Sequence, residues 1–244
     1  MYKISGKRNL KITLYIIILC ILLMLILIFL PSSKMELDEI PKEKLLTASM
    51  YKILGMLDEY NGRFNMAGTP IENFVESFGS DEKEIADYFD QCIQDFRNES
   101  KINFEYTRSK EGRVFESPQL SKIINSFYLM DKNIAALDIN IVKRASKEKK
   151  LLYIEGVYKR YRKSPQNLIL MANAEKKLNT VALILKELQC HNILIFKSEF
   201  SVPASSCVIF KPSPTVMKRL EIQQILTQKD IEEDGYFHLY KKIN

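Results

Sequence analysis

The 244-residue sequence has no tryptophan, two histidines and eight glycines. This scarcity excludes several enzyme classes, because the chain has neither a glycine-rich phosphate loop nor a G-x-S-x-G nucleophile turn. His191 and His238 lie far apart, and neither is followed by a metal-ligating residue at i+3 or i+4. Cys190 precedes His191, but adjacent side chains seldom face each other. We therefore predict no catalytic residues, no cofactor and no metal site.

The longest apolar run extends from Ile12 to Leu30 and contains no charged residue. At about 1.5 Å per residue it can cross a bilayer core of roughly 30 Å, so we predict one transmembrane anchor in the lipid bilayer. A cleaved signal peptide is disfavoured, because the run exceeds the usual h-region and the following L-P-S-S-K lacks an A-x-A site. The N-terminal flank is basic, with Lys3, Lys7, Arg8 and Lys11. The positive-inside rule predicts a single-pass inner-membrane protein with a cytoplasmic N-terminus and a periplasmic C-terminal domain.

Beyond this run the composition is that of a folded chain, and no internal repeat is apparent. The expected fold class is mainly α: one transmembrane helix, then a largely helical extracytoplasmic domain with a small α/β element near the C-terminus. The predicted division is a cytoplasmic basic tail over 1–11, the anchor over 12–30, a linker over 31–41, a helical region over 42–142, a basic connector over 143–163, and a helix with short strands over 164–244.

Periodicity and capping residues give the individual elements. A short amphipathic turn is expected over 69–78, and 98–114 is expected to be extended or looped. Two short apolar runs near the end predict strands. The expected helices cover 42–60, 80–96, 117–137, 168–189 and 216–226, and the expected strands are Ile193–Phe196 and Cys207–Phe210.

Charge is unevenly distributed along the chain. Residues 36–116 hold eighteen acidic and ten basic residues, whereas 143–163 hold nine basic and two acidic ones. Such a belt suits an anionic partner, which we expect to be an anionic surface or other envelope proteins; the alternatives are a solvated connector and nucleic acid, the latter unlikely outside the cytoplasm. The candidate binding residues are Lys143, Arg144, Lys147, Lys149, Lys150, Lys159, Arg160, Arg162 and Lys163, with Tyr153, Tyr158 and Tyr161 interleaved.

Three cysteines lie beyond the apolar run. In an oxidising compartment Cys190 and Cys207 are candidates for a disulfide, since the two expected strands could bring them together, and Cys92 would be left over. Three buried free thiols are the equally weighted alternative.

Short motifs resemble a family of uncharacterised single-pass inner-membrane proteins of Gram-negative bacteria. They are Asn103-Phe104-Glu105, Val114-Phe115-Glu116-Ser117 and the segment from Met171-Ala172-Asn173-Ala174 to Leu188. The resemblance implies a helical periplasmic domain and carries over no catalytic residue. We therefore expect a membrane-anchored envelope protein that acts as an interaction or scaffold module in a secretion, pilus or cell-wall assembly, rather than an enzyme. The alternative is a membrane-anchored extracytoplasmic hydrolase or transferase.

Overall fold

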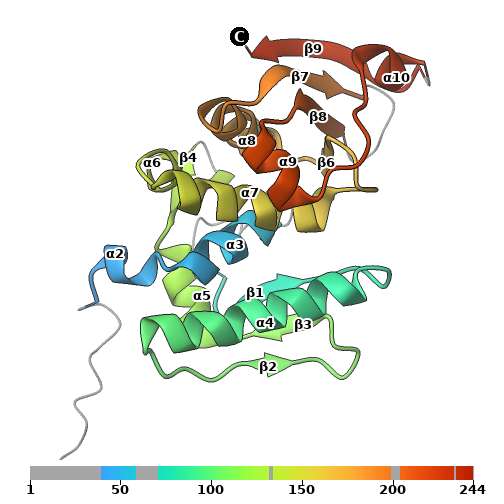
Figure 1. Ribbon diagram of the computed structural model, residues 1–244. Helices are drawn as coiled ribbons and strands as arrows, with labels where there is room; N and C mark the ends of the chain where they lie inside the picture. The colour runs from blue at the N-terminus through green and yellow to red at the C-terminus, as the bar shows by residue number, and fades with distance from the viewer. Residues whose placement is uncertain (1–39, 59–70, 132–133, 199–203, 234, 244) are drawn as a thin grey trace, which may run out of the picture. The chain divides into compact units, whose positions relative to one another are not determined.

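The computed structural model describes residues 40–58, 71–131, 134–198, 204–233 and 235–243. Residues 41–244 form one compact unit (Figure 1). The predicted tail, anchor and nearly all of the linker lie outside the described residues. Among the helices that the structure does describe, none combines the length and the apolar character that a membrane span requires.

The first part of this unit builds a helical layer against a three-stranded sheet. The short helix α2 comes first, and α4 lies against the sheet (Figure 1). The strands follow the order β1-β3-β2, with both pairs antiparallel. The elements are α2 (Lys42–Leu45), α3 (Ala48–Met56), β1 (Phe74–Ser77), α4 (Lys83–Ser100), β2 (Thr107–Arg108), β3 (Val114–Glu116) and α5 (Pro118–Asn125).

A small antiparallel pair and a short helix connect this part to the next. They are β4 (Tyr128–Asp131), β5 (Ile134–Leu137) and α6 (Ile139–Lys143). The second part forms an antiparallel sheet of order β6-β8-β7-β9. Its elements are α7 (Lys147–Tyr161), β6 (Leu168–Ala172), α8 (Glu175–Glu187), β7 (His191–Lys197), β8 (Ser205–Lys211), α9 (Pro214–Leu220), α10 (Gln228–Glu232) and β9 (His238–Ile243).

The two parts repeat one another. Each runs helix, strand, helix, strand, strand, helix, and in each the third strand pairs with both the first and the second. Each third strand leads into a helix that begins with Ser-Pro, at Ser117-Pro118 and at Ser213-Pro214. The described residues thus contain the same arrangement of elements twice, and in the second copy β9 adds a fourth strand.

The first helices of the repeats, α3 and α7, cross at a pair of glycines. A Cβ atom on Gly55 would overlap the carbonyl oxygen of Tyr153, and one on Gly156 would overlap that of Lys52. Glycine at both positions therefore lets the two backbones touch. Because α3 packs against α4 of its own repeat and against α7 of the other, it is buried on nearly every side. The buried residues include Met50, Tyr51, Ile53, Leu54, Met56 and Leu57.

The mainly α expectation is wrong, since three sheets occur among the described residues. Residues 168–189 are not one helix: β6 precedes α8, because alternate residues of 168–172 are buried between two layers. The expected turn at 69–78 contains strand β1, and the helix from Ser117 ends at Asn125, ahead of the β4–β5 pair. The strands β7 and β8 and the Ser117 cap of α5 are confirmed.

Replacing either crossing glycine should destabilise the protein. Gly55→Ala and Gly156→Ala would each push the α3 and α7 backbones apart. We therefore expect the free energy of unfolding to fall by about 1–3 kcal/mol or more, measured by chemical denaturation. Gly79→Ala is the matched control, because its new methyl group would meet only the side chains of Asp81 and Glu82. Equal losses for all three variants would contradict the close crossing.

Candidate functional site

The structure divides the nine candidate cations of 143–163 into engaged and free groups. Three exposed or half-exposed members are engaged at the surface of α7. Lys149 donates to the Leu46 carbonyl at 2.8 Å, Lys150 pairs with Glu187 at 2.7 Å, and the Lys159 ammonium lies 5.3 Å from the centre of the Tyr88 ring. These contacts connect α7 to Leu46, to α8 and to α4.

Arg160 is the buried member of the belt, with 8% of its surface exposed. Its guanidinium lies 3.2 Å from Glu76 and donates to the carbonyl oxygens of Met56 at 2.6 Å and Ser77 at 3.0 Å. It also stacks on Phe78. Burial alone would lower the pKa of Arg160, but neighbouring anionic groups, Glu76 foremost, outweigh it and raise that pKa. Arg160 therefore stays charged and joins α7 to both α3 and β1.

A second buried cation completes this cluster. Lys177 on α8 is only 2% exposed, and its ammonium donates to the carbonyl oxygens of Leu54 and Leu57. Carbonyls at the last turn of a helix have no partner within the helix, and cations there also match the helix dipole. Glu76 in turn accepts the Asp58 backbone N–H at 2.6 Å. The last turn of α3 is thus capped by charged side chains that stabilise the fold.

Within the described ranges, no three His, Cys, Asp or Glu side chains gather closely enough to hold a metal ion. The carboxylate of Glu76 is committed to Arg160 and to backbone N–H groups.

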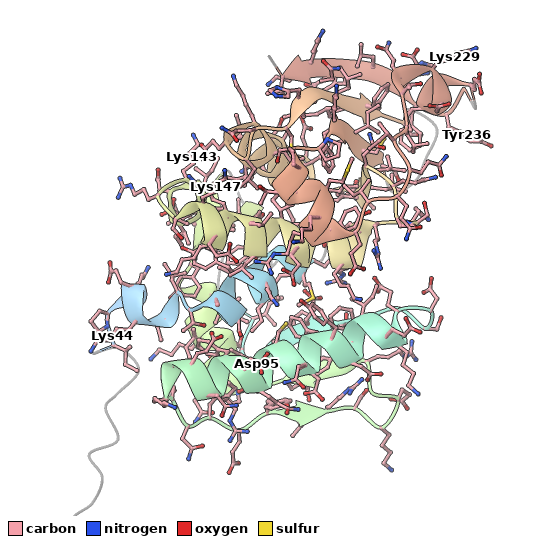
Figure 2. The ribbon with its side chains drawn as sticks, viewed as in Figure 1. Lys44, Asp95, Lys143, Lys147, Lys229 and Tyr236 are labelled. Carbon is pink, nitrogen blue, oxygen red and sulfur yellow. The ribbon has the colours of Figure 1, made fainter. Side chains whose placement is uncertain are left out.

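The free cations gather at the other end of the helix pair. Lys143, Arg144 and Lys147 are exposed around the start of α7, and none of them has an ion pair with any described residue. Lys42 and Lys44 of α2 are also exposed, although the Lys42 ammonium donates to the Ser126 carbonyl at 2.6 Å, and Figure 2 shows Lys44, Lys143 and Lys147 along one side. We call Lys42, Lys44, Lys143, Arg144 and Lys147 the α2–α6 basic surface.

A hollow of about 420 Å³ lies within this surface. Lys42, Arg144 and Lys149 line it together with Tyr51 and the start of α7. Two carboxylates also line it, and the Asp138 side chain accepts the Asn140 backbone N–H at 3.0 Å to cap α6. Glu148, the acidic neighbour of Lys147, is paired with Arg219 instead. The positive charge of the surface is therefore only partly neutralised.

The tyrosines of the belt are not available for stacking on a ligand. Tyr153 and Tyr158 are buried, and the Tyr158 hydroxyl donates to the Gln166 carbonyl at 2.7 Å. The Tyr161 hydroxyl donates to the Leu57 carbonyl at 3.1 Å. The two remaining cations, Arg162 and Lys163, follow α7; Arg162 stacks on Tyr158 and Lys163 is exposed.

The structure does not bring Cys190 and Cys207 together. Cys207 lies opposite Phe196, whereas Cys190 precedes His191, which lies opposite Lys211. At ~3.4 Å per residue, the four positions between Cys207 and Lys211 put the two cysteines well beyond the ~4.4–6.8 Å that a disulfide needs between Cα atoms. Both are buried free thiols, as is Cys92, while His191 is exposed.

Comparisons with known proteins give fold-level likenesses only. No family model and no curated protein matches the chain. Solved structures of mesophilic variants of the homing endonuclease I-DmoI are 13% identical, and the match covers 74% of this chain and 98% of that one, with a TM-score of 0.49. I-DmoI in complex with DNA and calcium is also 13% identical, over 78% of this chain and 98% of that chain, with a TM-score of 0.48.

These findings correct the class expected from the sequence. The resemblance to single-pass inner-membrane proteins with a helical periplasmic domain is wrong: no family model matches, and Phe104 and Phe115 are core residues of a mixed α/β unit. Three expectations that rested on this resemblance are withdrawn with it: the envelope scaffold, the membrane-anchored hydrolase or transferase, and the expectation that the protein is not an enzyme. The inner-membrane placement and the lipid and envelope partners find no support in the described residues, which exclude 12–30 and contain no helix long and apolar enough to span a membrane. The view that nucleic acid is an unlikely partner is also withdrawn, because it rested only on placing residues 143–163 outside the cytoplasm.

Arg160→Gln should be strongly destabilising. The substitution removes the cation facing Glu76, whose side chain is 1% exposed, and breaking one side of a buried pair costs about 3–5 kcal/mol. Lys163→Gln, an exposed change three residues later, should stay within about 0.5 kcal/mol of the parent. Urea denaturation of both variants measures the difference. Similar stability in the two would mean that the cluster does not hold α3 in place.

The thiols should be unreactive until the protein unfolds. Burial raises the pKa of Cys92 and of Cys207 to about 12, and it raises that of Cys190 as well, so little thiolate is present near neutral pH. Iodoacetamide at pH 8 should leave all three unmodified in native protein and alkylate all three in urea without reductant. Recovery of linked Cys190 and Cys207 peptides by mass spectrometry would contradict the structure.

Proposed function

We propose that this protein binds nucleic acid through the phosphate backbone, using the α2–α6 basic surface. The observation that carries the proposal is the group of five exposed cations from two segments, of which Lys42 and Arg144 line a hollow, while Lys143, Arg144 and Lys147 have no ion pair with a described residue. Exposed lysines and arginines in such a cluster neutralise phosphates and release their counterions.

Helix geometry adds to this charge. The fifteen-residue helix α7 begins at Lys147, beside Arg144 and the hollow. Its first backbone N–H groups carry the positive end of the helix dipole, which favours anions. The Ser146 side chain accepts the Lys149 N–H, and the other first-turn donors remain oriented toward this end.

Among the described residues, Glu43 and Asp138 line the hollow, and several other acidic side chains are paired with cations elsewhere. Asp87 and Asp90 on α4 are engaged by Arg108, and Glu155 lies 3.0 Å from Lys52. Of the basic residues 143–163, the buried Arg160 pairs with an acidic residue of the stretch 36–116, Glu76. The exposed part is left for a partner. Since the belt tyrosines are committed to the fold, the proposal is backbone binding with little base preference.

The test is a salt titration of binding to a labelled 30-base-pair duplex. Lys143→Gln/Arg144→Gln/Lys147→Gln should weaken binding most at low salt and reduce the slope of log K against log[salt] by about 2–3, since each phosphate contact contributes roughly 0.9. The matched control, Lys83→Gln/Lys101→Gln/Lys110→Gln, removes the same charge from exposed positions of the first repeat.

Two outcomes would overturn the proposal. One is an equal loss of affinity in both triple variants, which would show a general charge effect. The other is binding to anionic phospholipid vesicles without any binding to the duplex at low ionic strength.

A further inference from the structure

The second sheet has one apolar face that packs against the segment after α9, which includes α10. Side chains alternate along a strand, so Leu194 and Phe196 on β7 share a face with Cys207 and Ile209 on β8. The intervening residues, such as Val208, face the other way, where α8 packs. Part of the first face is covered by the segment that follows α9, through Leu226, Ile231 and Phe237.

This cover leaves a cavity of about 480 Å³. Leu194 and Ile209 form its floor, and the chain around Leu226 forms one wall. Three other lining residues, Met217, Ile225 and Leu239, are 39%, 44% and 41% exposed, although all are large and apolar. Large exposed apolar side chains that share one hollow are typical of a binding site.

Two lysines stand over the same face. Lys211 lies two residues beyond Ile209 on β8, and Lys242 on β9 pairs directly with Leu194. Both therefore project on the side of the cavity, and both line it. The lining includes no carboxylate, and neither lysine is ion-paired to a described residue. The hollow thus combines an apolar floor with positive charge that no carboxylate of the described residues balances.

A buried amide holds the wall in place. Asn167 is 1% exposed, and its side-chain N–H groups donate to the carbonyl oxygens of Phe210 at 2.7 Å and Leu226 at 3.0 Å. Its side-chain oxygen accepts the Leu226 N–H at 2.6 Å. These three bonds fix Leu226 against the sheet, so the cavity is formed in advance and a ligand need not order it.

We propose that this cavity binds a small amphipathic carboxylate. The hydrocarbon body lies against Leu194, Ile209, Ile225 and Leu239, and the carboxylate lies between Lys211 and Lys242. The volume is in the range of small-molecule sites, which are mostly apolar with a few charged groups that fix the ligand's orientation. The charge complementarity selects an anionic head over a neutral or cationic one.

Calorimetric titration of the full-length protein with decanoate tests this site. Decanoate should bind, decanol should bind less tightly, and decyltrimethylammonium should not bind. Lys211→Gln/Lys242→Gln should weaken decanoate by about tenfold and leave decanol unchanged, as expected when only the charge contacts are lost. The control, Lys229→Gln/Lys241→Gln, removes equal charge from residues outside the lining and should bind as the parent does.

A second variant separates the apolar contacts from the charges. Leu239→Ser removes an exposed part of the wall, so it should weaken decanoate and decanol alike with little effect on unfolding. Equal affinity for the three ligands, or unchanged decanoate binding in Lys211→Gln/Lys242→Gln, would overturn the proposal. Duplex binding should not change in these variants, because the cavity and the α2–α6 basic surface share no residue.

Discussion

The contact between Gly55 and Gly156 is the constraint on which the rest of this structure depends. Two helix backbones can meet so closely only where neither carries a side chain. The contact places α3 between the two repeats, so that nearly all its side chains are buried. Each repeat then supplies a sheet and a long helix on its own side of the crossing.

The ionic cluster at the end of α3 makes the two repeats interdependent. The last carbonyls of α3, a first-repeat helix, are capped by Arg160 and Lys177, which belong to the second repeat. Glu76, from the first sheet, balances Arg160. Neither repeat can satisfy these buried groups alone, and an unsatisfied buried charge is among the costliest defects in a fold. The two proposed binding surfaces lie outside this cluster.

The sequence predicted elements whose local signals are strong. The buried stripe of α4, the Ser117-Pro118 start of α5 and the strands β7 and β8 were all identified from spacing and caps. Strand β6 was not, because a short apolar run reads equally well as part of a buried helix. The repeated arrangement of elements could not be seen in the sequence, because α4 has eighteen residues and α8 thirteen, so corresponding elements are not a constant number of residues apart. Of the proposed nucleic-acid surface, the sequence named Lys143, Arg144 and Lys147 but missed Lys42 and Lys44, which are about a hundred residues away and carry no local signal.

The glycine crossing also has a genetic consequence. The two glycines face each other's backbones across one contact, so a methyl group on either helix already moves the pair apart. A second methyl group then enters space that the first has opened, and it should cost less than it would alone. Effects of neighbouring substitutions are non-additive in this way when they share a backbone shift. Positions 55 and 156 should therefore behave as one epistatic unit, in which the sequence tolerated at either position depends on the residue at the other.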